Sequence, residues 1–151
     1  MSLWDWSLKA YVREGVADAC LTLQDDHGQN TSLLLWAVWA ETSDPQQLAR
    51  AADIARRWER LALAPLRAMR RTLKPALAGV SDASREGLRE DVKAAELRAE
   101  RVLLEALEDL GGDRGGAPAL AALMAASTAW AGGAANRAPA NALAALAAAL
   151  S

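Results

Sequence analysis

Apolar residues recur along this chain at spacings of three and four, and residues that start or stop helices separate the recurring stretches. The first stretch predicts a helix capped by Ser2, with Trp4, Leu8 and Tyr11 on its inner face. The second predicts a short helix over about residues 16–26. Both helices are short, so each needs a partner to cover its apolar face.

The third stretch predicts the centre of the fold. It spans about residues 31–42, and residues 33–40 are apolar on every side of the helix. A helix of that kind is surrounded by other helices rather than lying on a surface. The residues that we expect to be mostly buried, here and on the other apolar stripes, are Trp36, Trp39, Leu35, Cys20, Trp58 and Leu103.

A long fourth helix is predicted to begin at Asp44. Asp44 is a capping residue, Pro45 occupies the first helical position, and the apolar stripe continues to about Leu73. Pro65 lies in the middle of this helix and cannot donate a backbone hydrogen bond. We therefore expect the rod to bend near Pro65.

A long fifth helix is predicted to follow a turn near Gly79. It opens at Ser81 or Ser84 and stops at Gly111 and Gly112. Because the connection is short, the fourth and fifth helices must lie antiparallel to bury their stripes against each other. The two form a long helical hairpin.

Composition restricts the fold class. The chain of 151 residues contains 37 alanines and 24 leucines but only 6 valines and no phenylalanine, so helix formers replace strand formers. The sequence therefore predicts an all-α protein: a compact five-helix bundle with a central apolar helix, a long antiparallel helical hairpin and an Ala-rich C-terminal tail.

The composition changes after residue 110 to Ala, Gly, Pro and Leu. We expect a helical domain over residues 1–110 and a low-complexity tail, with at most short helices, over residues 111–151. Leu143, Leu146 and Leu150 form an apolar edge on the tail. That edge is narrow, which predicts a tail that docks weakly and can be removed without unfolding the domain.

Charge is divided between the two long helices. Residues 45–75 carry a net charge of +6, and residues 81–113 carry a net charge of −5. Folding the hairpin about its turn predicts three ion pairs, which are Arg67 with Glu96, Arg60 with Glu100 and Arg56 with Glu105. Such pairs fix the docking register more than they add stability.

Four basic residues near the end of the fourth helix carry the only ligand-site hypothesis, and they are Arg67, Arg70, Arg71 and Lys74. Arg67, Arg71 and Lys74 share one helix face, so three donors point in one direction. They either pair with the acidic helix or hold an anionic small molecule. We expect Arg67 to pair with Glu96, and Arg71 and Lys74 to remain free.

Other candidate sites favour structural interpretations. Asp25, Asp26 and His27 lack the further ligands that a metal ion needs, and Cys20 has no assured base to activate it. The six tryptophans have helical spacing and leucine neighbours, which is typical of core packing. We therefore expect no catalytic residue, no metal and no cofactor.

Net charge, cysteine content and hydropathy suggest where the protein acts. A net charge of −2 argues against a nucleic-acid partner, and one cysteine cannot form an internal disulfide. The longest strongly apolar run, residues 33–40, is too short to span a bilayer. An acidic residue at position 5, where a secretory signal would carry a base, completes the prediction of a cytoplasmic protein.

Four segments of the chain form a distinctive combination, and they are residues 3–8, 15–39, 65–71 and 96–101, which include Leu3-Trp4-Asp5-Trp6, Leu33-Leu34-Leu35-Trp36 and Pro65-Leu66-Arg67-Ala68-Met69-Arg70-Arg71. Together they resemble a bacterial family of small helical proteins that is known only as a domain of unknown function. The resemblance covers about residues 3–110. It implies no activity, substrate or cofactor.

Two functions from different classes remain. The first is a non-enzymatic module that presents a helix face or its tail to an unknown protein partner. The alternative is a binding module for an anionic small molecule held by the basic face.

Overall fold

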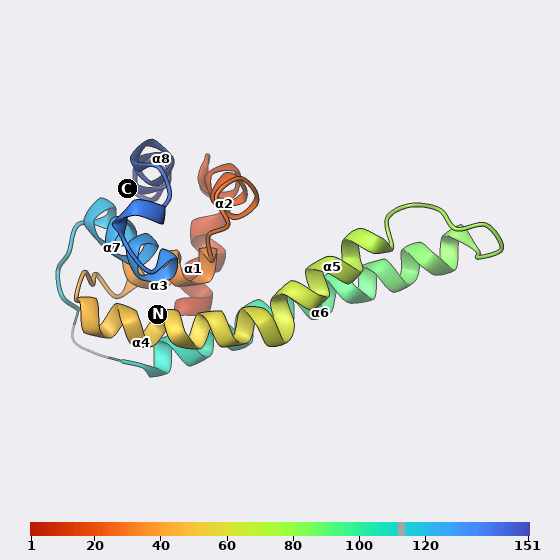
Figure 1. Ribbon diagram of the computed structural model, residues 1–151, viewed down its shortest axis with the longest axis horizontal. Helices are drawn as coiled ribbons and strands as arrows, with labels where there is room; N and C mark the ends of the chain where they lie inside the picture. Colours follow the sequence, from red (N-terminus) through yellow and green to blue (C-terminus); the bar gives the residue numbers. More distant parts are fainter. Residues whose placement is uncertain (112–113) are drawn as a thin grey trace.

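The structure is a computed structural model that describes residues 1–111 and 114–151, and every regular element in those ranges is helical (Figure 1). The all-α fold class is therefore confirmed. The elements are α1 (Leu3–Tyr11), α2 (Val16–Asp25), α3 (Thr31–Trp39), α4 (Pro45–Trp58), the π-helical turn η1 (Glu59–Leu63), α5 (Ala64–Thr72), α6 (Asp82–Asp109), α7 (Ala119–Ala131), the 3₁₀ turn η2 (Ala134–Asn136) and α8 (Ala140–Leu150).

The prediction of five helices is wrong. The elements α4, η1 and α5 run on without a break, so the described residues form seven helical rods. The two additional rods are α7 and α8, both in the segment that composition assigns to a tail. The predicted end of α6 agrees at Gly111, which has a positive φ of 49°, whereas Gly112 lies outside the described residues.

The molecule consists of a rounded head and a projecting arm (Figure 1). The head contains α1 to α4, α7, α8 and the C-terminal part of α6. The arm, residues 64–95, contains α5, the N-terminal part of α6 and the turn between them. The predicted antiparallel hairpin is present, and its outer half extends away from the head.

Helix starts follow the capping chemistry in the sequence. The Asp44 carboxylate accepts hydrogen bonds from the backbone N–H groups of Gln46 and Gln47, and Pro45 opens α4. The Ser81 hydroxyl accepts one from the N–H of Ser84, which decides between the two predicted starts of α6. Backbone N–H groups in the first turn that find an acceptor stabilise the N-terminal end of each of these two helices.

Pro65 affects the long rod through a π turn. A proline ring in a regular α-helix collides with the carbonyl four residues earlier. Here the preceding residues 59–63 widen into η1, where the N–H of Ala64 bonds to the carbonyl of Glu59, five residues back. The chain therefore continues past Pro65 as a helix, with one wide turn between α4 and α5.

The core confirms α3 as the central helix. All residues from 31 to 37 are buried, and α3 packs against α1, α2, α4, α6 and α7. Of the residues expected to be buried, Trp36, Leu35, Cys20 and Leu103 are at most 3% exposed. Trp39 and Trp58 are partly buried against the core.

The predicted inner face of α1 is wrong. The buried residues are Leu3, Ser7 and Ala10, whereas Leu8 and Tyr11 are exposed. Trp4 lies between the two faces, and the Arg101 guanidinium lies 5.2 Å from the centre of its ring. An arginine from α6 therefore covers part of the indole of the partly buried Trp4.

The expectation that the C-terminal segment docks weakly is also wrong. Helix α7 packs against α3 and α4, and α8 packs against α2. Leu123, Leu143 and Leu146 are fully buried in the same core cluster as α3. Alanines around these leucines let the helices approach closely, so a narrow apolar edge is enough to dock. The predicted division of the chain at residue 110 remains a prediction, which a truncation would test.

Candidate functional site

Helix α5 carries three of the basic candidates, Arg67, Arg70 and Arg71, and Lys74 follows its C-terminal end. Arg67 and Arg70 point toward α6 and are partly buried, whereas Arg71 and Lys74 are exposed. The four do not form one surface. Each therefore has to be considered with its own neighbours.

Glu96 on α6 holds two of these arginines. Arg70 donates to it twice, from Nε at 2.7 Å and from Nη2 at 3.4 Å. Arg67 Nε lies 3.7 Å from the Glu96 carboxylate, and Arg67 Nη1 donates to Glu59 at 2.9 Å. Glu96 is only 8% exposed, so these contacts form a largely buried ion-pair cluster. The predicted pairing of Arg67 with Glu96 is confirmed.

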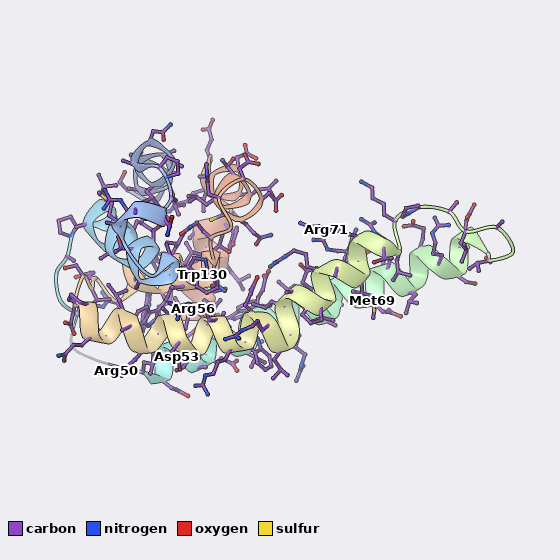
Figure 2. The ribbon with its side chains drawn as sticks, in the orientation of Figure 1. Arg50, Asp53, Arg56, Met69, Arg71 and Trp130 are labelled. Carbon is purple, nitrogen blue, oxygen red and sulfur yellow. The ribbon has the colours of Figure 1, made fainter. Side chains whose placement is uncertain are left out.

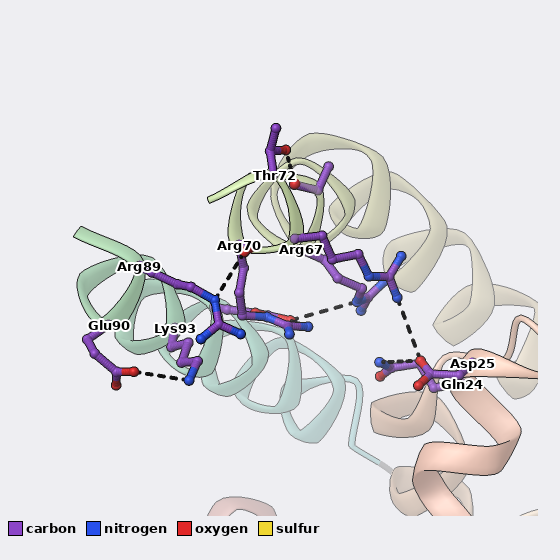
Figure 3. Close-up of polar contacts among 11 residues, drawn as sticks. Gln24, Asp25, Arg67, Arg70, Thr72, Arg89, Glu90 and Lys93 are labelled. Atoms are coloured by element: carbon purple, nitrogen blue, oxygen red, sulfur yellow. Dashed lines mark hydrogen bonds and ion pairs between the residues drawn. The ribbon is translucent and has the colours of Figure 1, made fainter. Parts of the chain in front are cut away.

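Further contacts join α5 to neighbouring helices (Figure 3). Arg89 Nε on α6 donates to the backbone carbonyl of Arg70 at 3.3 Å. Arg71 lies 3.8 Å from the Asp25 carboxylate at the end of α2, and both side chains are well exposed. Lys74 forms no ion pair with any residue that the structure describes. The prediction that both stay free is therefore wrong for Arg71, which pairs with Asp25, and agrees with the described residues for Lys74.

The other two predicted pairs do not form between described residues. Arg56 instead donates to the backbone carbonyl of Ala129 on α7, and Glu105 binds Arg101 one turn away on α6. Arg60 is exposed. Helix α7, which the sequence did not predict, takes the place beside Arg56 that was assigned to the acidic helix.

A second acidic group lies beneath the ion-pair cluster. The pKa of the Glu100 carboxyl is raised to about 7, chiefly by burial and also by the nearby Glu96 and Glu59 carboxylates. Arg67 and Arg70 act in the opposite direction. Glu59, Arg67 and Glu100 line a small cleft with Asn30 and Gln29 at the junction of the head and the arm. The cleft has room for about one water molecule.

At this junction the Glu100 carboxyl can exchange a proton near neutral pH, whereas the nearby thiol is unreactive. Burial raises the pKa of the nearby Cys20 thiol to about 11, so the thiol is protonated and a poor nucleophile. No group of three or more acidic, cysteine or histidine side chains is placed to hold a metal ion within the described ranges. The ion pairs of this junction join α5 and η1 to α6.

Glu59 and Glu100 are members of this cluster that the sequence pattern did not predict. Glu59 opens the π turn, so the direction of Arg67 relative to Glu59 does not follow from a count at 3.6 residues per turn. The sequence did contain one signal of this change in direction, because a proline inside a long amphipathic helix marks a place where the helical phase changes.

The fold defines this protein as an all-α protein with a long helical hairpin on a helical head. No helix in the described parts of the chain is both long and apolar enough to span a bilayer. Residues 2–107 match the family described as protein of unknown function (DUF2390), and the chain belongs to that family. No curated protein and no solved structure matches the chain. The family match ends before α7, although α7 and α8 complete the core.

Proposed function

We propose that this protein is a non-enzymatic interaction module whose arm binds a partner protein. The observation that carries the proposal is the incomplete packing of the arm. A two-helix hairpin covers only one side of each helix, and in this arm large apolar side chains outside the contact between the two helices stay open to solvent. Met69 on α5 and Leu88 on α6 are each 51% exposed.

The apolar surface continues to the tip of the arm. Leu77 and Val80 in the turn are 63% and 45% exposed. Exposed apolar side chains grouped on one projecting element are typical of an interaction surface. The head lies at the other end of the arm and leaves the tip accessible (Figure 1).

Charge specifies the chemistry of the partner. The arm, residues 64–95, carries a net charge of +3, and Arg71 and Lys74 are its most accessible cations. An acidic amphipathic helix fits this surface, because its apolar face would cover Met69 and Leu88 while its carboxylates meet the basic rim. The lone buried Cys20 fits a reducing compartment, so we place this interaction in the cytoplasm.

Capture from a native extract tests the proposal. The tagged protein and a Met69→Glu/Leu88→Glu variant serve as baits, and mass spectrometry identifies what each retains. Leu21→Glu is the matched control, because Leu21 is 56% exposed on α2 in the head. Circular dichroism checks that all three are folded. Proteins retained by the wild type and by Leu21→Glu but lost from the arm variant support the proposal, and identical protein sets from all three baits would contradict it.

A second candidate function is anion binding at Arg71 and Lys74. It is favoured by the lack of an ion pair for Lys74 among the described residues and by the long 3.8 Å contact of Arg71 with Asp25. Arg67 and Arg70 contribute less, since the Glu96 and Glu59 carboxylates already neutralise them. A phosphate titration compared between the wild type and Arg71→Ala/Lys74→Ala tests it, and equal binding by both proteins argues against it.

A further inference from the structure

A groove on the head lies between α4 and α7, away from the arm. Its volume is about 380 Å³, within the range of small-molecule sites. The fully buried Leu48 forms part of its floor, and Met124, Ala125 and Ala129 from α7 form much of its wall. The lining is mostly apolar.

Two arginines supply the charge of this groove. Arg56 comes from α4, and Arg137 comes from the segment between η2 and α8. None of the residues that line the groove is acidic. Asp53, one turn before Arg56, pairs instead with the exposed Arg57 at 3.2 Å. Both groove arginines are partly buried, and neither forms an ion pair among the described residues.

The Arg56 guanidinium is held in place. Its Nη2 donates to the Ala129 carbonyl at 2.7 Å, and its Cζ lies 5.9 Å from the centre of the Trp130 ring (Figure 2). Trp130 is itself fixed, because its Nε1 donates to the carbonyl of Gly28 at 2.8 Å. These contacts use one face and one donor of the guanidinium, so further N–H groups remain available to a ligand.

We propose that the α4–α7 groove binds a small amphipathic carboxylate, with its hydrocarbon body against Leu48 and Met124 and its carboxylate between Arg56 and Arg137. An apolar groove rewards the burial of a hydrocarbon body. Two guanidinium groups without acidic partners attract a single anionic head, and a carboxylate matches the donor fork of either one. The pairing of an apolar lining with a positive charge selects against fully polar anions and against neutral lipids.

Decanoate is the test ligand, and tryptophan fluorescence of the full chain is the readout. Trp130 lies next to Arg56, so binding should change its emission, and a Trp130→Phe variant assigns the signal to this residue. Decanol has the same hydrocarbon body without the charge, and acetate has the charge without the body. All three are titrated below the concentration at which decanoate aggregates.

Arg56→Gln and Arg137→Gln remove the two cations, and Arg50→Gln is the matched control on the exposed side of α4 (Figure 2). We expect each groove variant to bind decanoate about tenfold more weakly, since a charge-assisted hydrogen bond contributes that much. Decanol should bind the wild type about tenfold more weakly than decanoate. Arg50→Gln should match the wild type. Arg137→Gln keeps the test valid if Arg56→Gln unfolds, because Arg137 makes no hydrogen bond to α7 in the described structure.

Three results would overturn the proposal. One is the absence of saturable decanoate binding. Another is equal affinity for decanoate and decanol, which would mean that the arginines do not recognise the head. The third is an equal loss of affinity in Arg50→Gln and Arg137→Gln, which would indicate a general effect of net charge.

Discussion

The Ser127 hydroxyl donates a 2.8 Å hydrogen bond to Oε1 of Gln29, although 98 residues separate the two in the chain. The same hydroxyl oxygen accepts a hydrogen bond from the N–H of Ala138 at 2.8 Å. Both side chains are buried. One serine therefore joins the connection between α7 and α8 to the loop between α2 and α3, and the C-terminal helices share a polar contact as well as a core with the rest of the head.

Ser127→Ala should destabilise the protein by roughly 1–3 kcal/mol, because it leaves the buried Ala138 N–H and the Gln29 side chain without their partner. Chemical denaturation monitored by circular dichroism measures the change. Ser84→Ala is the control, since Ser84 is exposed in the arm, and it should change the stability by less than about 0.5 kcal/mol. Equal effects of the two substitutions would show that the Ser127 contact adds no stability.

Removal of residues 111–151 should unfold the head. The truncation uncovers the sides of α2, α3 and α4 on which Leu123, Leu143 and Leu146 pack, and each buried leucine contributes about 1.5–3 kcal/mol. We expect a shortened chain of residues 1–110 to lose its cooperative thermal transition. A sharp transition within a few degrees of that of the full chain would contradict this and would support a domain boundary at residue 110.

The stability should depend on pH through Glu100. Its carboxyl has a pKa of about 7 in the folded protein against an ordinary value of 4.5, so between these values the folded state binds more protons than the unfolded state. The contribution of Glu100 to stability is therefore greatest below pH 4.5 and is lost as the pH rises through 7. Glu100→Gln should raise the free energy of unfolding at pH 8 by roughly 2 kcal/mol and flatten its pH dependence between pH 5 and 7.

Glu105→Gln is the comparison for Glu100→Gln. Glu105 pairs with Arg101 on the exposed side of α6. Its substitution should therefore give the same pH dependence of the free energy of unfolding as the wild type. Urea denaturation at intervals of half a pH unit gives the profiles. Parallel profiles for the wild type and Glu100→Gln would show that another group titrates in this range.

Glu96 should stabilise the base of the arm far more than an exposed glutamate does. Glu96→Gln leaves the partly buried Arg70 without its carboxylate, and we expect a loss of about 2 kcal/mol or more. Glu90→Gln breaks the exposed contact with Lys93, at 3.0 Å, and should cost less than about 0.5 kcal/mol. A double-mutant cycle of Glu96→Gln with Arg70→Gln measures the coupling, and a coupling near zero would contradict the assignment.

Local signals in the sequence were sufficient to predict most of the fold. The caps at Asp44 and Ser81 gave the starts of the two long helices, and the run of apolar residues in α3 gave the central helix. The C-terminal helices were missed for a physical reason. Alanine-rich segments have weak apolar periodicity, and their docking depends on close approach to surfaces that no local pattern describes.

The candidate site was only partly predictable. The pairing of Arg67 with Glu96 follows from folding an antiparallel hairpin, and the structure contains it. The sequence also predicted that Arg67, Arg71 and Lys74 share one helix face, yet Arg67 contacts Glu59 and Glu96, and Lys74 lies beyond the end of α5. The π turn before Pro65 changes the helical phase, so positions counted from α4 do not give directions in α5.

Because of the π turn, the directions in which the α5 side chains point depend on the number of residues in that one turn. One residue of an α-helix corresponds to a rotation of about 100° around the axis. If the chain lost the exposed Leu61, η1 could close into an ordinary α-helical turn, and α5 would rotate as a unit while α4 kept its place in the head. Arg67 and Arg70 would leave Glu96, and a different set of side chains would line the arm. A deletion of one residue would thus change the surface that the arm presents without any substitution in the arm itself.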